Sequence, residues 1–252
     1  MLLHFGMCLM RIEKIILCGI VVFMLGCIVP VATYSVFAND NADNGNKPTM
    51  IVEYGTGKDV GLVKVTHIDY ATRPNQGKPP AKTASCYKLA GWKWSSPIQY
   101  TIPNDRALTQ AITASMGTWD SATKGNLFTT PGIGTYPWGG YSDGINSISY
   151  GNYQKDGVIA VTGTWYTRGT KIAVESDILF DTDFVWGDAT VHPGVMDLQN
   201  IATHEIGHTL GLSDIYTESC NTVTMYGYST EGDTGKRVLE LPDITGLLKI
   251  YP

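Results

Sequence analysis

Two histidines and a glutamate near residue 205 have the spacing of a metal site. His204, Glu205 and His208 form the pattern HExxH. On a helix, residues four apart lie one turn apart on the same face, so both imidazole rings can reach one ion. Zinc suits imidazole nitrogen, and Glu205 can reach a water that the metal activates and act as a general base. Two histidines and a glutamate also occur by chance on helices, so a purely structural role remains the alternative.

The residues that follow provide a third ligand. Gly211 can adopt the positive φ that ends a helix, and the chain can then turn back so that Asp214 points at the metal. A carboxylate oxygen is an accepted zinc ligand. His192 competes for this role, but it lies in a loop sequence, Val-His-Pro, where a histidine is more often a surface residue. Met225 stands where a turn can pass beneath the ligands, and Asp214 is favoured over His192.

The extended motif resembles that of the metzincin clan, and within it the matrixin-like enzymes of microbes. The resemblance spans about residues 86–252 and rests on the signature HExxHxxGxxH/D, a methionine turn, and the strand and helix sequences on either side. The matching residues are His204, Glu205, His208, Gly211, Met225, Asp177–Phe180 and Leu241–Gly246. The resemblance implies a zinc endopeptidase whose metal is held by the two histidines and Asp214 and whose base is Glu205.

Three features depart from the best-known members of the clan. The third ligand is Asp214 where most members have histidine, and its charge should make the metal a slightly weaker Lewis acid. The acidic cluster that binds calcium in animal matrixins keeps Asp181 and Asp183 but has Phe184 where an acid is expected, so calcium is an open expectation beside zinc. Cys86 lacks the Pro-Arg-Cys-Gly context of a latency cysteine, which favours a disulfide over a thiolate that blocks zinc.

The segments around the motif predict an α+β domain, from apolar residues at strand and helix spacing. The predicted strands are residues 94–102, 145–150, 158–166 and 172–180, and the predicted helices are residues 105–122, 197–210 and a last helix entered through Pro242. The resemblance implies a metzincin-like domain: a twisted, mixed, mostly parallel sheet of five strands with an antiparallel edge strand, an active-site helix and a C-terminal helix. An extended peptide could pair with the edge strand at residues 157–166, and the side-chain pocket would be walled by residues 226–239.

Residues 1–38 predict a signal peptide. Arg11 and Lys14 precede an apolar run that extends to about Ala32, and Val36–Ala38 fits the small-residue rule for cleavage. The run is also nearly long enough to remain as a membrane anchor, and Leu25–Cys27 faintly resembles a lipid-attachment site. Cleavage after residue 38 is favoured and predicts a secreted protein with an extension at residues 39–85 and a catalytic domain at residues 86–252.

The extension at residues 39–85 has two interpretations. Residues 51–70 could form a short hairpin, and residues 73–82 are rich in proline and typical of a linker. One interpretation is a pro-segment that blocks the site until it is removed. The other is a stalk or a strand pair packed on the domain, in which His67 is structural or solvated. The sequence does not decide between them.

Composition limits the classes of molecule that the protein is expected to bind. The formal net charge is −5 and no basic run appears, which argues against nucleic acid. Of the five cysteines, only Cys86 and Cys220 lie outside the leader, and in an exported protein they most simply form one disulfide. We expect a monomer that acts on protein or peptide substrates and has no membrane partner after signal cleavage.

The leading hypothesis is therefore a secreted, zinc-dependent endopeptidase in which a glutamate base works on zinc-activated water. One alternative is a binding module that keeps the fold but does not cleave peptides, although a protein without catalytic activity would have no need of Glu205. A second is a processing protease of narrow specificity, anchored in the membrane by an uncleaved leader.

Overall fold

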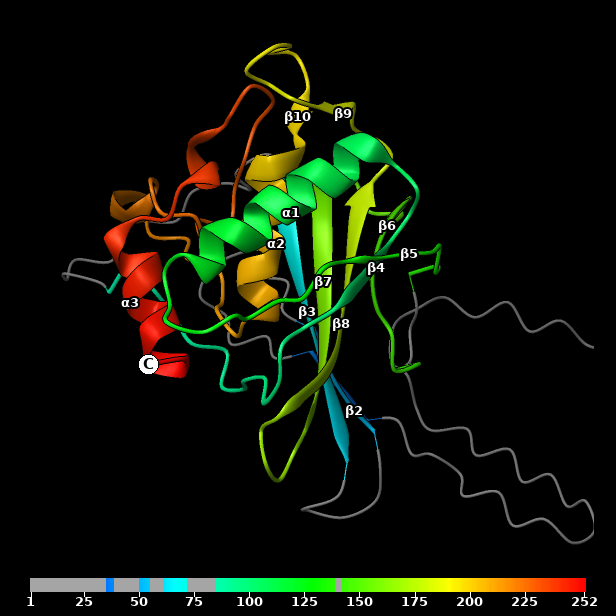
Figure 1. The fold of residues 1–252 in the computed structure, drawn as a ribbon, viewed down its shortest axis with the longest axis vertical. Coiled ribbons are helices and arrows are strands. Elements are labelled where there is room, and N and C mark those ends of the chain that lie inside the picture. Colours follow the sequence, from blue (N-terminus) through cyan, green and yellow to red (C-terminus); the bar gives the residue numbers. More distant parts are fainter. Residues whose placement is uncertain (1–34, 39–49, 55–60, 72–84, 139–141) are drawn as a thin grey trace, which may run out of the picture. The chain divides into compact units, whose positions relative to one another are not determined.

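The computed structural model describes residues 35–38, 50–54, 61–71, 85–138 and 142–252 (Figure 1). The predicted leader lies outside these residues except for Ser35–Ala38, and the predicted linker at residues 73–82 lies outside them too. None of the helices in the described ranges has the length and apolar character that a membrane crossing requires.

The centre of the fold is the five-stranded sheet that the resemblance implied. Its strands are β4 (Tyr100–Ile102), β5 (Gly132–Ile133), β6 (Asn146–Gly151), β7 (Val158–Thr167) and β8 (Ala173–Asp181). They lie in the order β7-β8-β6-β4-β5, in which β7 pairs antiparallel with β8 and the other pairs are parallel. The predicted α+β class, with a mostly parallel sheet and one antiparallel strand, is confirmed.

The N-terminal region adds strands to this sheet. They are β1 (Ser35–Ala38), β2 (Met50–Tyr54) and β3 (Leu62–Tyr70), which extend the sheet to eight strands in the order β1-β2-β3-β7. The predicted hairpin within residues 51–70 is confirmed, because β2 and β3 pair antiparallel. Strand β3 also pairs antiparallel with β7 along its whole length, so β7 is an internal strand and not the edge that we expected.

Two helices cover one face of the sheet. Helix α1 (Arg106–Asp120) begins after Asp105, whose side chain accepts a hydrogen bond from the Leu108 N–H at 2.9 Å. Its apolar stripe is buried against helix α2 (Leu198–Thr209), and the Trp119 indole donates to the Thr203 carbonyl at 2.8 Å. In Figure 1 the two helices lie together in front of the strands. They place the HExxH residues between α1 and the sheet.

The chain after α2 folds back over the end of that helix. It forms a parallel bridge between Ile215 and Tyr226, the short helices η1 (Glu218–Cys220) and η2 (Gly235–Arg237), and helix α3 (Leu241–Ile250). A small parallel pair, β9 (Trp186–Gly187) and β10 (Met196–Asp197), precedes α2. Cys86 and Cys220 form a disulfide bond that ties η1 to the start of the domain.

The predicted strand at residues 94–102 is too long. Strand β4 begins only at Tyr100, and the residues before it make single bridges, Lys93 with Ile172 and Ile98 with Phe128. The Trp94 indole instead donates to the Thr209 carbonyl at the end of α2. The alternation of apolar residues in this segment therefore reflects which side chains are buried. It does not reflect a continuous run of strand hydrogen bonds.

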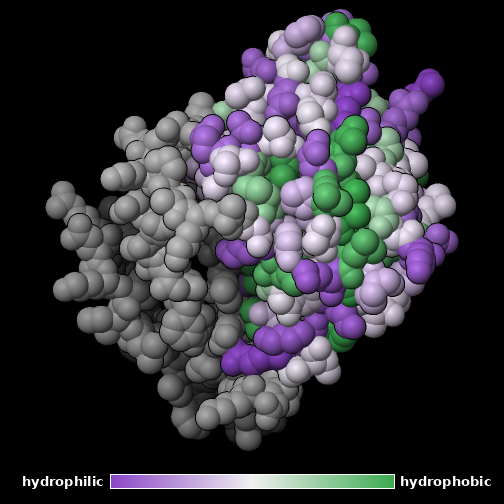
Figure 2. All heavy atoms as spheres, turned by 90° about the vertical axis from the view of Figure 1, so that its left-hand side faces the viewer, coloured by the Kyte–Doolittle hydropathy of each residue, from purple (hydrophilic) through white to green (hydrophobic). Residues whose placement is uncertain are grey.

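Figure 2 shows apolar residues in a band bordered by polar ones on the face that carries the C-terminal part of the chain. Large exposed apolar side chains in this part of the sequence are Val238, Leu241 and Leu248. Scattered apolar residues are normal on a protein surface and do not mark a binding site by themselves.

Candidate metal centre

Helix α2 fixes the positions of the HExxH side chains. Asp197 caps its first turn by accepting from the Asn200 N–H at 2.8 Å, and Arg237 in turn holds the Asp197 carboxylate. The helix ends at Thr209, and Gly211 just beyond it has the positive φ, 96°, that the sequence predicted. Its Cβ would lie 2.6 Å from the Trp92 carbonyl oxygen, so no other residue fits the turn without movement.

Three polar atoms form a nearly equilateral triangle at the centre of the site. His204 Nε2 and His208 Nε2 are 3.1 Å apart, and each lies 3.2 Å from Asp214 Oδ1. Ligands of a tetrahedral zinc ion at bond lengths of about 2.0–2.1 Å are separated by roughly 3.3 Å. The triangle therefore has the dimensions of one face of a tetrahedral zinc site. Its donor set, two imidazoles and a carboxylate, suits the same metal.

The backbone sets which ring nitrogen faces this point. His204 Nδ1 lies 2.7 Å from the Thr224 carbonyl oxygen, and His208 Nδ1 lies 2.9 Å from the Leu212 carbonyl oxygen. A carbonyl oxygen only accepts, so each Nδ1 carries a proton, and Nε2 is the nitrogen that can offer a lone pair to a metal. Such contacts orient metal-binding histidines in known sites.

Glu205 lies beside the triangle in a fully buried position. One carboxylate oxygen accepts from the Thr162 hydroxyl on β7, while Oε1 has no hydrogen-bond partner. Burial raises the pKa of this carboxyl to about 8. A buried carboxylate with one unpaired oxygen, beside a group of metal-ligating side chains, is suited to take a proton from a reacting water.

Charge is balanced within the triangle. Burial alone would raise the pKa of Asp214, but the positive charge of His208 and hydrogen bonds from the histidines hold it well below its usual range. Burial opposes a charge on His208 as well, yet the Asp214 carboxylate raises the pKa of that ring to about 9. The carboxylate thus attracts a positive charge to the centre of the site, and a divalent cation would supply one.

The turn that contains Met225 lies directly under α2. Met225 is buried, and a Cβ on Gly207 would collide with its sulfur. Asp243 at the start of α3 holds the turn by accepting from the backbone N–H of Thr224 at 2.9 Å and of Met225 at 3.2 Å. The same turn provides the carbonyl that orients His204. Helix α3 therefore supports the site through the backbone of this turn.

Strand β3 brings two residues to the site that sequence analysis missed. His67 was expected to be structural or solvated, but it is 1% exposed and stacks on the His208 ring with the ring centres 4.0 Å apart. Its Nδ1 lies 3.5 Å from Asp214 Oδ2, and neither of its nitrogens has a hydrogen-bond partner. Burial lowers the pKa of this ring to about 4.

Asp69, the second of these residues, is fully buried and has no hydrogen-bond partner on either carboxylate oxygen. The Nζ of Lys236 lies 3.9 Å from Asp69 Oδ2. Two sets of three side chains have potential metal-binding atoms within 4.8 Å of one another. One set is Asp69, His204 and Glu205, and the other is His67, His208 and Asp214. The alternation of His67 and Asp69 in a strand was the available signal, since residues two apart face the same side.

The other candidate ligands lie elsewhere. His192 is exposed in the loop before α2. Asp181 accepts from the backbone N–H groups of Tyr153 and Asp183, and Asp183 accepts from the Asn152 amide. Within the described ranges, no group of three potential metal ligands includes His192, Asp181 or Asp183. The structure therefore gives no support to calcium at Asp181 and Asp183.

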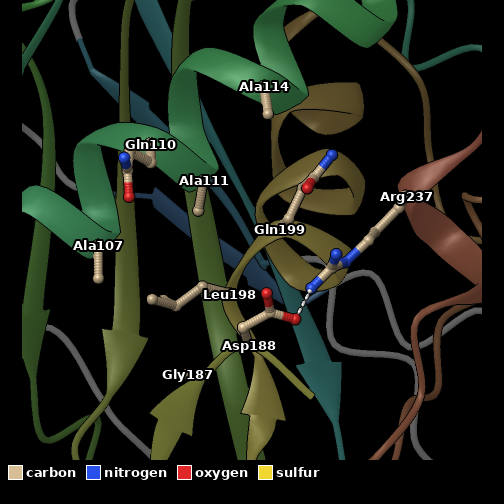
Figure 3. Close-up of a pocket in the computed structure, with 9 residues that line it drawn as sticks. All are labelled: Ala107, Gln110, Ala111, Ala114, Gly187, Asp188, Leu198, Gln199 and Arg237. Carbon is tan, nitrogen blue, oxygen red and sulfur yellow. Dashed lines mark hydrogen bonds and ion pairs between the residues drawn. The ribbon is translucent and has the colours of Figure 1, made fainter. Parts of the chain in front are cut away.

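A surface cavity of about 280 Å³ lies away from these residues, between α1, β9 and the start of α2 (Figure 3). Arg237 reaches over it to Asp188, 2.7 Å away. The cavity contains none of the HExxH side chains, and it has no role in the chemistry that the site supports.

Comparison with known proteins agrees with this geometry. Residues 144–252 match the sequence profile of the matrixin family. A search among curated proteins found no match. The matched region contains the HExxH helix, the turn at Met225 and helix α3, which together build the His-rich centre. Residues 144–252 therefore form a matrixin domain, the domain of a metzincin zinc metalloendopeptidase.

Proposed function

We propose that His204, His208 and Asp214 hold the zinc ion and that Glu205 is the general base of peptide hydrolysis. The observation that carries this assignment is the triangle of donor atoms with edges of 3.1–3.2 Å, with Glu205 Oε1 unpaired beside it. Gly211 and Met225 are structural: the first turns the chain towards Asp214, and the second fills the space under α2.

A zinc ion in this position would supply an acidified water and a positive charge to stabilise the oxyanion of the attacked carbonyl. Glu205 takes the proton of the water at Oε1 and passes it to the leaving amine. Thr162 fixes the other oxygen of Glu205, so the carboxylate keeps one orientation through both transfers. No side chain needs to form a covalent bond with the substrate.

The test compares the wild type with Glu205→Gln, an isosteric change that removes the base and leaves the three ligand residues intact. We expect both proteins to retain about one zinc ion per chain by metal analysis and only the wild type to cleave casein after activation. Cleavage by Glu205→Gln at the wild-type rate would remove Glu205 from the mechanism. Absence of zinc from both would remove the metal assignment.

We further propose that the extension at residues 39–85 is a pro-segment that keeps the enzyme latent. Strand β3 pairs along β7, the strand to which we expected an extended substrate to add. His204, Glu205 and His208 are all 0% exposed with β3 in place. His67 and Asp69 face the metal centre and exclude a peptide carbonyl from it.

Latency can be tested in the full chain with His67→Ala and Asp69→Ala together. The wild type should be inactive until a second protease separates β3 from the domain, and the double variant should cleave a fluorogenic peptide before any such cut. Mass spectrometry of the active species would locate the cut. Equal activity of the intact and the cut wild type would contradict latency.

The proposed setting is extracellular, with the leader removed after Ala38 and the protein acting as a monomer. The disulfide between Cys86 and Cys220 supports an oxidising compartment. The N-terminal residue of the exported protein should be Asn39, and light scattering should give the mass of a single chain. Retention of residues 1–38 in a membrane fraction would instead favour the anchored processing protease.

A further inference from the structure

Strand β3 lies on β7 as an extended peptide would. The register is antiparallel from Leu62 opposite Thr167 to Asp69 opposite Ala160, and His67 lies opposite Thr162. Because Thr162 binds the catalytic Glu205, His67 marks the point of this bound peptide that faces the metal centre. The remaining side chains of β3 therefore show what the surface along β7 accepts at other positions.

The two faces of β3 have different surroundings. Val65, His67 and Asp69 share the face that contains the metal centre. Lys64 points to the opposite face, where it lies in one row with Trp165 of β7 and Glu175 of β8. It precedes the residue at the metal centre by three positions, and only 7% of its surface is exposed.

An aromatic and acidic group of residues surrounds Lys64, and we call it the Lys64 cluster: Trp138, Trp165, Glu175 and Asp177. The Lys64 Nζ lies 4.3 Å from the ring centre of Trp165 and 5.1 Å from that of Trp138. Both distances are within the range of cation–π attraction, which increases when the cation is desolvated. Gly163 leaves room for the lysine stem, because a Cβ there would lie 2.9 Å from Lys64 Cε.

Two carboxylates complete the Lys64 cluster. Glu175 accepts from the Ser142 hydroxyl at 2.6 Å, and Asp177 accepts from the backbone N–H and the hydroxyl of Ser147 at 2.9 and 2.8 Å. Both are at least 96% buried, which penalises their charge. Burial lowers the pKa of Lys64 to about 8, and the attraction of Asp177 and Glu175 opposes that shift. Hydrogen bonds orient the carboxylates, and the lysine supplies the positive charge.

We propose that the Lys64 cluster is a subsite for a basic side chain of the peptide substrate, three residues before the one at the metal centre, and that Lys64 occupies it in the latent enzyme. The inference rests on the proposed peptidase function and on the binding of substrate along β7. The residues that hold the subsite belong to β7, β8 and the loop before β6, so they remain after β3 leaves. The enzyme should then prefer lysine or arginine at this position.

A binding experiment tests this subsite without turnover. The host is the full chain with Glu205→Gln, to prevent cleavage, and Lys64→Glu, to weaken the tethered strand, whose effective concentration is otherwise about millimolar. The probes are three fluorescent peptides with the sequence of residues 61–71. They carry lysine, norleucine or glutamate at the position of Lys64. Norleucine keeps the apolar stem and removes only the charge.

We expect the lysine peptide to bind about tenfold more tightly than the norleucine peptide, as fits a buried cation–π contact, and the glutamate peptide to bind more weakly than either. Equal affinities, or no binding of any peptide, would overturn the subsite. If the host does not fold, Lys64→Met replaces Lys64→Glu, and the affinities of the same three peptides are compared.

Hydrogen exchange on the chain itself gives a second measurement. Lys64→Glu should increase exchange of the β3 and β7 amides at least about tenfold, whereas the α1 amides stay at the wild-type rate. Lys124→Glu, at an exposed position, is the matched control. Unchanged exchange in β3 would mean that the cluster does not hold the strand, against the proposal. Lysine-selective binding by a chain that never cleaves casein would contradict the peptidase assignment alone.

Discussion

Individual residues of the site differ in how far the sequence could identify them. His204, Glu205 and His208 follow from helical spacing alone, because one short segment contains them all. His67 and Asp69 could not be found this way. They reach the metal centre only because β3 pairs with a strand about a hundred residues later. Their alternation shows that they share a face, but no local pattern identifies the distant strand with which β3 pairs.

At the scale of one residue, Asp214 and His192 were rivals for the third ligand, and they give opposite predictions. Asp214→Ala should weaken zinc binding by more than the ~10–100-fold that loss of a residue behind the ligands costs. His192→Ala, in an exposed loop, should leave affinity unchanged. Titration against a chromophoric chelator measures both. An effect of His192→Ala alone would reverse the assignment.

Helices were easier to predict than strands. Asp105 and Asp197 mark the starts of α1 and α2, since a short polar side chain at the N-cap is a local signal. The start of β4 was placed too early, because the apolar alternation near Trp94 reflects buried side chains. A strand is defined by hydrogen bonds to a partner strand elsewhere in the sequence, and the local pattern does not contain that partner. The number of strands in the sheet was likewise underestimated by the three from the N-terminal region.

Packing beneath α2 gives a prediction at the scale of elements. A Cβ on Gly207 would collide with Met225 and lie 2.8 Å from the Trp119 ring, so Gly207→Ala should lower the free energy of unfolding by about 1–3 kcal/mol. Gly117→Ala is the control on a helix whose glycine meets nothing within 4 Å. It should stabilise the protein by roughly 0.5–1 kcal/mol. Urea unfolding of both variants measures the two effects. If Gly207→Ala stabilised the protein, the predicted collision with Met225 would be wrong.

On the scale of the whole molecule, the sheet joins two regions with different roles, the strands β4 to β8 and the N-terminal strand β3. Its part from β4 to β8 carries the catalytic helix, while β3 closes the surface along β7 on which a peptide would lie. The sequence suggested a hairpin within residues 51–70 but left open whether it was a pro-segment or a packed strand pair. The structure shows it packed in the sheet, and the proposed latency follows from the position of that packing over the metal centre.

The disulfide is the covalent link between the start of this catalytic region and the loop after α2. Cys86 and Cys220 are 134 residues apart, so the bond closes a long loop and lowers the entropy of the unfolded chain. Cys86→Ser with Cys220→Ser should lower the free energy of unfolding by roughly 2–5 kcal/mol. The proposed ligands lie on α2 and at Asp214, before η1 in the chain, so zinc content in the folded variant should stay at the wild-type value. Urea unfolding and metal analysis separate these effects, and a variant as stable as the wild type would show that non-covalent packing alone holds η1 in place.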